Sequence, residues 1–320
     1  MNAKTRILVT GASGFVGSAF LERHAARDDL LLHGVGRRAL ARPDYTAADL
    51  SRPFELPFRP DVVIHAAARS SPWGSPQDYR RHNVDATREV LAWCRRNGLP
   101  RVVYVSSSSV FYRDADQFGI TEDSPIGPRF VNDYAATKYA GEALVAAYEG
   151  SSVIARPRAV FGPGDTVLFP RILRAARRGR LPLIDTGRPP AVGDLIYVET
   201  LCDYLLTLAL RDDLRASYNL TNDEPVAIQT FLLEAFERLG LPAPRRRVPV
   251  RVARGAAAFG EWLYRTFRLP GEPPITRFGV GVFTQSKTFD VTRMRRDLGP
   301  PSVSLAEGVT RFVDWQRRQC

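Results

Sequence analysis

The chain has 320 residues, of which 44% are hydrophobic and 25% are charged, a balance typical of one large or two modest globular domains. No apolar run approaches the ~20 residues that cross a bilayer, and the N-terminus lacks the layout of a signal peptide, so we expect a cytoplasmic protein without membrane insertion. The net charge of +11 comes from scattered arginines without a nucleic-acid-binding motif, and we expect no nucleic-acid partner. The dispersed cysteines Cys94, Cys202 and Cys320 predict neither a metal site nor a disulfide framework.

Short apolar runs alternate with helical patterns through the N-terminal half. Strands are predicted at residues 6–10, 30–35, 61–66, 101–105 and 152–156. Helices are predicted after the first strand through residue 25, and at residues 84–96 and 132–148. Continuous apolar strands separated by helices are typical of a parallel sheet covered on both faces. The predicted fold class is therefore α/β, with a Rossmann-type doubly wound parallel sheet.

A glycine loop joins the first predicted strand to the first predicted helix. The spacing GxxGxxG allows a tight turn, close approach of the backbone to a pyrophosphate, and close packing of the helix. The N-terminus of the helix adds free N–H groups and the positive end of its dipole. We therefore expect a dinucleotide cofactor on this loop, held by Gly11, Ser13, Gly14, Phe15, Val16 and Gly17.

The end of the second predicted strand distinguishes NAD from NADP. NAD sites usually carry an acidic residue there, whereas this chain has Gly36, Arg37 and Arg38. Two guanidiniums suit the 2′-phosphate of NADP, and Gly36 leaves room for it. We predict that Arg37 and Arg38 select NADP; NAD is the alternative if they are only a solvated surface pair. Asp49 and Leu50 are expected beside the adenine.

Hydroxyl groups and an amine accompany this cofactor site. The serines 106–109 follow the fourth predicted strand, at the sheet edge where parallel α/β proteins bind ligands. Tyr134 and Lys138 are spaced to share one helix face, and Lys138 is one of only three lysines in an arginine-rich chain. Because a nearby ammonium lowers a phenol's pKa, Tyr134 is predicted to exchange a proton with an alcohol or ketone oxygen. Ser108, with Ser107 next, is predicted to hold that oxygen, unless the serines form only a polar loop or a helix cap.

The second half of the chain is less regular. A basic helix is predicted at residues 173–180, and residues 194–198 and 217–220 are predicted to return as strands to the same sheet. Residues 250–267 mix arginine with aromatic residues, as in an amphipathic lid, a packed helix or a contact with a membrane surface.

Two regions are expected from these changes of pattern. The cofactor-binding domain comprises residues 1–165 with 192–222. The smaller, mostly helical substrate region comprises residues 166–191 with 223–320.

Together these motifs resemble the extended short-chain dehydrogenase/reductase superfamily. The matching segments are Thr10-Gly11-x-x-Gly14-x-x-Gly17, residues 61–67, Asn83-Val84-x-Ala86-Thr87, residues 106–108, Tyr134-x-x-x-Lys138 and residues 156–165. The resemblance implies that Ala66 and Ala67 line the nicotinamide side of the crevice and that Asn83 is the superfamily's helix asparagine. It also implies that Arg158 and the turn at residues 162–164 border the substrate, and that a homodimer forms through the helices that carry Val84 and Tyr134.

The C-terminal half is similar to one branch of this superfamily, which includes 3β-hydroxysteroid dehydrogenases and bacterial 2-alkyl-3-oxoalkanoate reductases. The similar segments are residues 271–277, 287–293 and 297–299, together with Ser71-Pro72-Trp73-Gly74.

Three functional hypotheses follow. The first is an NADP(H)-dependent oxidoreductase that interconverts a ketone and a secondary alcohol on a lipid-like or sterol-like small molecule. The second is a nucleotide-sugar epimerase or reductase with tightly bound NAD, which Arg37 and Arg38 disfavour. The third is a non-catalytic NADP-binding regulatory protein, which the intact set of Ser108, Tyr134 and Lys138 disfavours.

Overall fold

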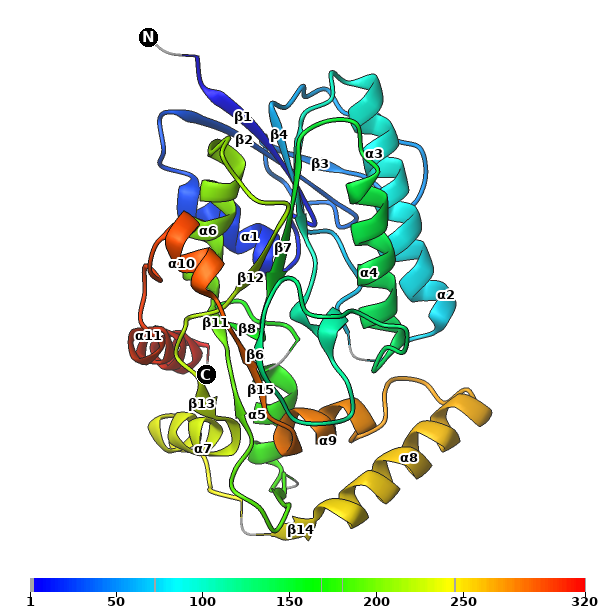
Figure 1. Cartoon of the computed structure of the whole chain (residues 1–320), viewed down its shortest axis with the longest axis vertical. Coiled ribbons are helices and arrows are strands. Elements are labelled where there is room, and N and C mark those ends of the chain that lie inside the picture. The colour runs from blue at the N-terminus through cyan, green and yellow to red at the C-terminus, as the bar shows by residue number, and fades with distance from the viewer. Residues whose placement is uncertain (1–2, 72, 168, 180, 245, 320) are drawn as a thin grey trace.

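The computed structural model describes residues 3–71, 73–167, 169–179, 181–244 and 246–319. Within these residues, a seven-stranded parallel sheet forms the centre of the molecule (Figure 1). Its strands are β1 (Thr5–Thr10), β2 (Leu30–Gly36), β3 (Tyr45–Ala47), β4 (Val62–His65), β5 (Arg101–Val105), β7 (Ser152–Pro157) and β12 (Ser217–Leu220). They lie in the order β3-β2-β1-β4-β5-β7-β12. Successive strands of the chain are added on one side of β1 as far as β3 and on its other side from β4 onward, so the strand order changes direction between β1 and β4. The predicted doubly wound α/β fold is confirmed.

The register of the central strands brings three candidate segments to one edge of the sheet. Thr10 at the end of β1 pairs with His65 at the end of β4, and Val105 at the end of β5 pairs with Ala155. The glycine loop, Ala66 and the serines 106–109 directly follow β1, β4 and β5. Because parallel strands end at the same edge, these segments lie where doubly wound sheets bind ligands.

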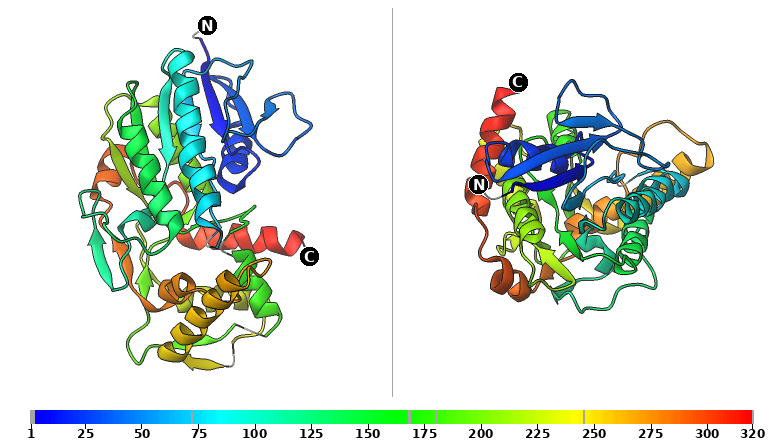
Figure 2. Two further views of the ribbon diagram at one scale, coloured as in Figure 1. Left: turned by 90° about the vertical axis from the view of Figure 1, so that its right-hand side faces the viewer. Right: turned by 90° about the horizontal axis from the view of Figure 1, so that it is seen from above.

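Helices cover both faces of the main sheet (Figures 1 and 2). α1 (Phe15–His24) and α6 (Val198–Leu210) pack together on one face. α3 (Ala86–Arg96) and α4 (Asp133–Ala146) cover the other face. α3 continues from α2 (Pro76–Tyr79) and from the π-helical turn η1 (Arg80–Asp85). The buried residues of α3 recur at the spacing of three to four that gives a helix one apolar face.

Helices dominate the second half of the chain. Besides α6, they are α5 (Phe169–Arg177), α7 (Ile228–Arg238), α8 (Val250–Thr266), α9 (Arg277–Thr284), α10 (Thr292–Leu298) and α11 (Leu305–Arg318). α7, α8 and α9 lie beyond the carboxyl ends of the main strands (Figures 1 and 2). This region therefore closes over the edge that carries the candidate site.

Short strands connect the two halves of the chain. One small sheet has the order β13 (Val226–Ala227), β10 (Val192–Gly193), β15 (Lys287–Phe289) and β6 (Gln117–Ile120). Two further pairs are β8 (Val160–Phe161) with β11 (Ile196–Tyr197), and β9 (Leu183–Asp185) with β14 (Arg247–Pro249). The turn η2 (Ser108–Phe111) follows β5.

The structure corrects two expectations about the second half. Residues 217–220 do join the main sheet as β12, but residues 194–198 do not: Ile196 and Tyr197 pair with β8, and Val198 begins α6. The apolar run that predicted a central strand is explained by burial of Ile196 and Tyr197 in the same core as the sheet. The basic helix begins at Phe169, four residues before the predicted start, and Arg180 lies outside the described residues.

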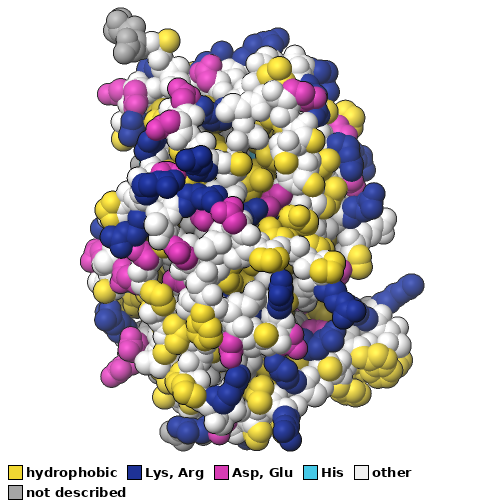
Figure 3. Space-filling model, in the orientation of Figure 1, with side chains coloured by type: hydrophobic (Ala, Val, Ile, Leu, Met, Phe, Trp, Pro, Cys, Tyr) yellow, Lys and Arg dark blue, Asp and Glu magenta, His cyan; other side chains and the backbone are white. Residues whose placement is uncertain are grey.

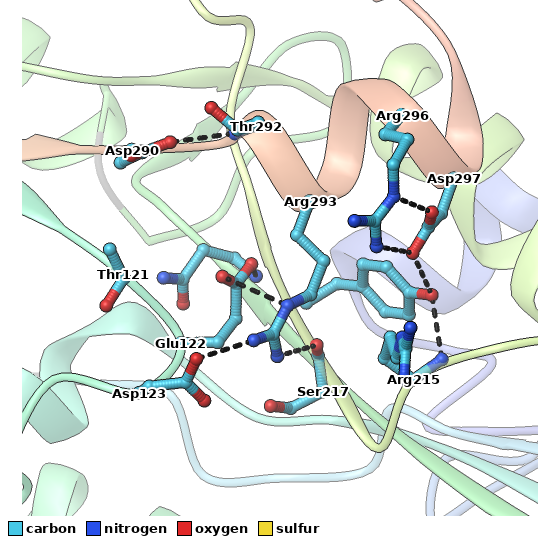
Figure 4. A network of polar contacts seen from close by, with 12 residues as sticks. Thr121, Glu122, Asp123, Arg215, Ser217, Asp290, Thr292, Arg293, Arg296 and Asp297 are labelled. Atoms are coloured by element: carbon cyan, nitrogen blue, oxygen red, sulfur yellow. Dashed lines mark hydrogen bonds and ion pairs between the residues drawn. The ribbon is translucent and has the colours of Figure 1, made fainter.

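Polar contacts anchor α10 to the edge strand β12 (Figure 4). Arg293 lies 2.7 Å from a carboxylate oxygen of Asp123 and 3.6 Å from one of Glu122, and it donates to the carbonyl of Ser217. The backbone N–H of Asn219 in β12 donates to Glu122 at 2.8 Å. β12 is thereby held from the side that has no neighbouring strand.

Candidate active site

A large pocket of about 1150 Å³ opens at the carboxyl edge of the main sheet. One end is lined by the glycine loop, by residues 36–38 and by residues 48–51. The other end is lined mainly by apolar side chains of the C-terminal region, including Phe231, Val252 and Phe278. The residues 106–109, Tyr134 and Lys138 line the wall of this same pocket.

The glycine loop has a geometry that only glycine fits. Gly11 has a φ of +69°, and a Cβ there would lie 2.8 Å from the Cα of Ala67. A Cβ on Gly17 would lie 2.5 Å from the carbonyl oxygen of Gly11. The helix that follows has no side-chain cap and no acidic residue in its first turn. Its N–H groups and dipole therefore suit the pyrophosphate of a dinucleotide.

A chain of buried hydrogen bonds supports the neighbouring turn at Ala66 and Ala67. The N–H of Ala67 donates to the hydroxyl of Thr10, which lies 2.7 Å from Nδ1 of His65. Nε2 of His65 lies 3.0 Å from the hydroxyl of Thr87. Burial lowers the pKa of His65 to about 3, so this imidazole is neutral and serves as a fixed hydrogen-bonding group.

Asn83 connects this turn to the helix that carries Tyr134. Its Oδ1 accepts from the N–H of Arg69 at 2.7 Å, and its Nδ2 donates to the hydroxyl of Thr137 at 3.0 Å. The π-helical turn η1, which contains Asn83, is not evident from periodicity, and such turns are frequent at functional sites. Asn83 thus has a positioning role for the loop and for α4.

The residues predicted at the adenosine end all line the pocket. Arg38 donates to the carbonyl of Ser13, and Arg37 lies 3.2 Å from Nε2 of His82. Asp49 forms an ion pair with Arg81 at 2.8 Å, which leaves less of its carboxylate free for an adenine. A Cβ on Gly36 would lie 2.9 Å from the hydroxyl of Tyr45, so packing is a further reason for glycine there.

Tyr134 and Lys138 lie one turn apart on α4, as their spacing predicts. Lys138 is 1% exposed, and its Nζ has no hydrogen-bond partner among the described residues. The amine lies 4.1 Å from the ring centroid of Tyr104. Burial lowers the pKa of Lys138 to about 7, against which Glu142 acts. An unpartnered buried amine in a pocket wall is suited to the hydroxyls of a bound ribose.

The expected lowering of the Tyr134 pKa is wrong for this structure. The pKa of Tyr134 is raised from its ordinary value, first because the phenol is buried; the side chain of Ser107 acts in the opposite direction. Lys138, one turn away, is not among the groups that act on this pKa. Tyr134 is therefore a neutral phenol, which is the form that donates a proton.

The serines 106–109 have separate partners. Ser106 donates to Glu142 at 2.5 Å, and Ser107 caps η2 by accepting from the N–H of Ser109. Ser108 lies 3.1 Å from the hydroxyl of Tyr112. Of the two candidate serines, Ser107 is the one that affects the pKa of Tyr134, whereas Ser108 is bound to Tyr112. The helix-cap interpretation also holds for Ser107, and does not conflict with a second role.

A family model described as the NAD dependent epimerase/dehydratase family matches residues 7–221. The chain belongs to this family. It is 33% identical over 330 residues to 2-alkyl-3-oxoalkanoate reductase of Stenotrophomonas maltophilia, covering 96% of this chain and 98% of the relative. It is 30% identical over 293 residues to 3beta-hydroxysteroid-dehydrogenase/decarboxylase isoform 1 of Arabidopsis thaliana, covering 85% of this chain and 66% of the relative.

Solved structures agree with this assignment. MoeE5 in complex with UDP-glucose and NAD has a TM-score of 0.72 at 25% identity, covering 98% of this chain and 99% of that chain. The chain is therefore an NAD(P)-dependent enzyme of the extended short-chain dehydrogenase/reductase type, in the branch that contains the two relatives above. The non-catalytic hypothesis is excluded by this result.

The substrate end of this epimerase/dehydratase-family enzyme has features that the motifs do not predict. Tyr112 bridges Ser108 and Arg158, whose guanidinium carbon lies 5.3 Å from the Tyr112 ring centroid. Tyr112 is not among the residues predicted from the sequence, where its spacing of four residues from Ser108 is the signal that could have indicated it. The turn at residues 162–164 does not line the pocket, in the part of the chain that the structure describes. Asp165, which follows that turn, accepts from the N–H of Phe169 at the start of α5.

The loop that resembles the reductase branch packs against α8. The ring of Trp73 lies 6.3 Å from that of Tyr264, and the guanidinium of Arg265 lies over it at 5.3 Å. Pro72 lies outside the described residues. An ion pair between Arg171 of α5 and Glu272, with Ser71 at 3.2 Å from Arg171, joins the same loop to the pocket's other side. Arg171 and Glu272 line the pocket, so these contacts place the loop beside the pocket wall.

Helix α8 is a packed helix with an exposed aromatic side. Ala253 and Ala257 are buried against α9 and β9, and Val252, Ala253 and Ala256 line the pocket. Phe259, Trp262 and Phe267 are 54–62% exposed. Hydrophobic side chains gather at the projecting end of this helix, beside arginines (Figure 3).

Cys94 and Cys202 are buried free thiols whose pKa burial raises, and Cys320 lies outside the described residues. In the described ranges, no group of three His, Cys, Asp or Glu side chains is placed to hold a metal ion. A helix long and apolar enough to cross a bilayer is not found among the described residues.

Proposed function

We propose that this enzyme interconverts a ketone and a secondary alcohol on a lipid-like substrate with NADP(H). The observation that carries the proposal is the position of Tyr134 and Lys138. They line one wall of a single pocket whose two ends are a glycine loop and an apolar chamber. A substrate carbonyl from the apolar end and a nicotinamide from the other end would meet beside these two side chains.

The chain's own residues supply positioning and a proton. The bound nicotinamide supplies or accepts the hydride at the carbinol carbon. Tyr134, as a neutral phenol, donates its proton to the forming alkoxide, and Ser107 or Ser108 holds that oxygen by a hydrogen bond. The glycine loop would hold the pyrophosphate, and the amine of Lys138 would find its missing partners in a ribose. Ser108, with Ser107 next, is the residue predicted from the sequence, and the lowering effect of Ser107 on the Tyr134 pKa keeps both serines as candidates.

The preference for NADP rests on Arg37 and Arg38. Both side chains are exposed, line the pocket and have no carboxylate within ion-pair distance among the described residues. Guanidiniums without a carboxylate partner at this point suit the 2′-phosphate that distinguishes NADP. NAD, which the structure of MoeE5 contains, is the alternative cofactor.

The lipid-like substrate class rests on the apolar end of the pocket and on the names of the relatives. A 2-alkyl-3-oxoalkanoate and a 3β-hydroxysteroid each join a large apolar body to an oxygen that such chemistry can act on. In this proposal residues 1–165 with 192–222 hold the cofactor, and residues 166–191 with 223–320 hold the substrate. The nucleotide-sugar hypothesis remains the alternative, because MoeE5 binds UDP-glucose.

The proposal is tested by following the absorbance of the reduced nicotinamide. We expect the purified enzyme to oxidise NADPH with a long-chain 3-oxo acid or a ketosteroid, and not to act on UDP-glucose. Tyr134→Phe should abolish turnover and leave the Kd for NADPH within about threefold, because only the proton donor is lost. Tyr139→Phe, on the exposed side of the same helix, is the matched control. Normal turnover by Tyr134→Phe, or activity on UDP-glucose alone, would refute the proposal.

Two surfaces complete the proposal. A homodimer through α3 and α4 is implied by the resemblance alone and is checked by light scattering.

The exposed side of α8 is proposed to touch a lipid surface without insertion, because Phe259, Trp262 and Phe267 project beside Arg265 and Arg268. Such a contact would place the entrance of the pocket close to a lipid-like substrate.

A further inference from the structure

Arg158 is a buried cation in the wall of the pocket. It directly follows β7, and its backbone N–H donates to the carbonyl of Leu220 at the end of β12. Its side chain is only 5% exposed and borders the pocket together with Ser108 and Tyr112. The next residue, Ala159, has a φ of +41° and lines the same pocket. The backbone therefore turns sharply at the point where it presents Arg158.

The guanidinium of Arg158 has no counter-charge in contact. Among the described residues, no carboxylate lies within 4.0 Å of it, and its buried Nε has no hydrogen-bond acceptor. Its charged end lies over the face of the Tyr112 ring, with the guanidinium carbon 5.3 Å from the ring centroid. A buried arginine normally has both a carboxylate and several acceptors, as Arg156 has two residues earlier. Arg158 therefore differs from the structural arginines of the same core.

A second buried cation, Lys287, lies in the surroundings of Arg158 and influences it electrostatically. Lys287 is also buried, and its amine contacts neutral acceptors: two backbone carbonyls and the side chain of Gln117. The buried Asp194 influences Arg158 from beyond ion-pair distance, and its carboxylate accepts from the N–H of Phe289. Burial raises the pKa of Asp194 to about 6, which leaves this carboxylate mostly ionised at neutral pH. Asp116 and Asp114 act on Lys287, whereas the carboxylate that acts on Arg158 is Asp194, which lies beyond ion-pair distance.

We propose that Arg158 binds a carboxylate of the substrate, so that the enzyme acts on oxo acids or hydroxy acids rather than on uncharged ketones. This inference rests on the proposed function, because it assigns a second group of the same substrate. Tyr112 contacts Ser108 on one side and Arg158 on the other, so the anion site lies one aromatic ring away from the candidate reacting hydroxyls. Such spacing suits a compound in which the ketone and the carboxylate are near neighbours. The planar guanidinium can accept a carboxylate in two parallel hydrogen bonds.

The alternative role for Arg158 is purely structural, as a cation that holds the Tyr112 ring. A structural role affects charged and uncharged substrates alike, whereas carboxylate recognition affects only the charged one. The informative comparison is therefore between a long-chain 3-oxo acid and its methyl ester. The two compounds differ at the carboxylate and share the reacting ketone.

The first test compares kinetics with these two substrates and NADPH. In Arg158→Met we expect the KM for the 3-oxo acid to rise about 10- to 150-fold, the usual worth of a hydrogen bond to a charged group, with the KM for the methyl ester changed less than about threefold. Arg158→Lys should give an intermediate KM for the acid, because it keeps the charge and loses the planar pair of donors. Arg129→Met, an exposed arginine outside the pocket, is the matched control and should change neither value. Equal effects on acid and ester, or no effect on either, would overturn the inference.

The second test uses wild-type enzyme and does not depend on turnover or on the folding of a variant. The Kd of a long-chain 3-hydroxy acid, measured by calorimetry with NADPH present, should be at least about tenfold lower than that of its methyl ester. Equal affinities would overturn the inference even where the ketone is reduced well, which leaves the proposed function standing. Failure to reduce every ketone would refute the proposed function, and the affinities of acid and ester would still decide the role of Arg158.

Discussion

The buried ion pair between Arg156 and Glu142 gives the sharpest stability prediction. Nε and one Nη of Arg156 donate to the two carboxylate oxygens of Glu142 at 2.9 and 2.8 Å, and Ser106 donates to the same carboxylate at 2.5 Å. The two side chains are 7% and 4% exposed. The pair joins β7 to α4, the helix that also carries Tyr134 and Lys138.

Glu142→Gln removes the charge and keeps the shape. Removing one partner of a buried pair costs about 3–5 kcal/mol, because the remaining charge stays buried. The amide oxygen of the new side chain and the Phe111 ring, 4.9 Å from the guanidinium, still interact with Arg156. We therefore expect a loss near the lower end, about 3 kcal/mol, which is roughly a 150-fold increase in the unfolding constant.

Urea unfolding followed by circular dichroism measures this loss. The matched control is Glu307→Gln, which breaks the exposed pair with Arg311 on α11 and should cost at most about 0.5 kcal/mol. Replacing both partners together, as Glu142→Leu with Arg156→Met, should recover part of the stability because no charge is left buried. A loss below about 1 kcal/mol for Glu142→Gln, or a loss equal to that of the control, would refute the reasoning.

Three further predictions concern the cofactor, the lysine and the surface. Arg37→Ala with Arg38→Ala should weaken NADP roughly 100-fold and NAD less than about threefold, since only NADP carries the 2′-phosphate; equal losses in Kd would make the pair ordinary surface charge. Between pH about 7 and 10.5 the unfolded chain keeps the Lys138 proton that the folded chain has released, so the stability of wild type relative to Lys138→Met should increase with pH in urea unfolding at pH 7 and 9. A constant difference would contradict the lowered pKa of Lys138. Phe259→Ser with Trp262→Ser should abolish sedimentation with phosphatidylglycerol vesicles, while Phe118→Ser, an equally exposed aromatic elsewhere, should not; absence of wild-type sedimentation would remove the proposed lipid contact.

Much of the main sheet and of its flanking helices could be predicted because local patterns of apolar and glycine residues indicate them. The apolar runs at β1, β4, β5 and β7 each gave a strand, and the glycine spacing gave the turn before α1. The shared helix face of Tyr134 and Lys138 followed from a spacing of four. The run at residues 194–198 misled because burial in the short strand β11, which pairs with β8 outside the main sheet, requires the same composition as a central strand.

The electrostatics of the site could not be predicted from residue types. Lysine four residues after tyrosine suggests an acidic phenol, yet the folded chain buries both side chains, and burial raises the pKa of Tyr134 and lowers that of Lys138. The same limit applies to Arg158: its sequence neighbours do not reveal that Arg156 has a carboxylate partner and that Arg158 has none. Both properties depend on contacts between segments far apart in the chain.

The path of the chain has a practical consequence for fragment studies. The last strand of the main sheet, β12, comes from residues 217–220, and β6 from the first half pairs with β15 from residues 287–289. A fragment that ended at residue 165 would keep the pairing of β7 with β5 but leave the other side of β7 as an open sheet edge, a state prone to aggregation, and β6 without its neighbour. The nucleotide-binding half is thus not a detachable module, and a split enzyme would need both pieces to be produced together.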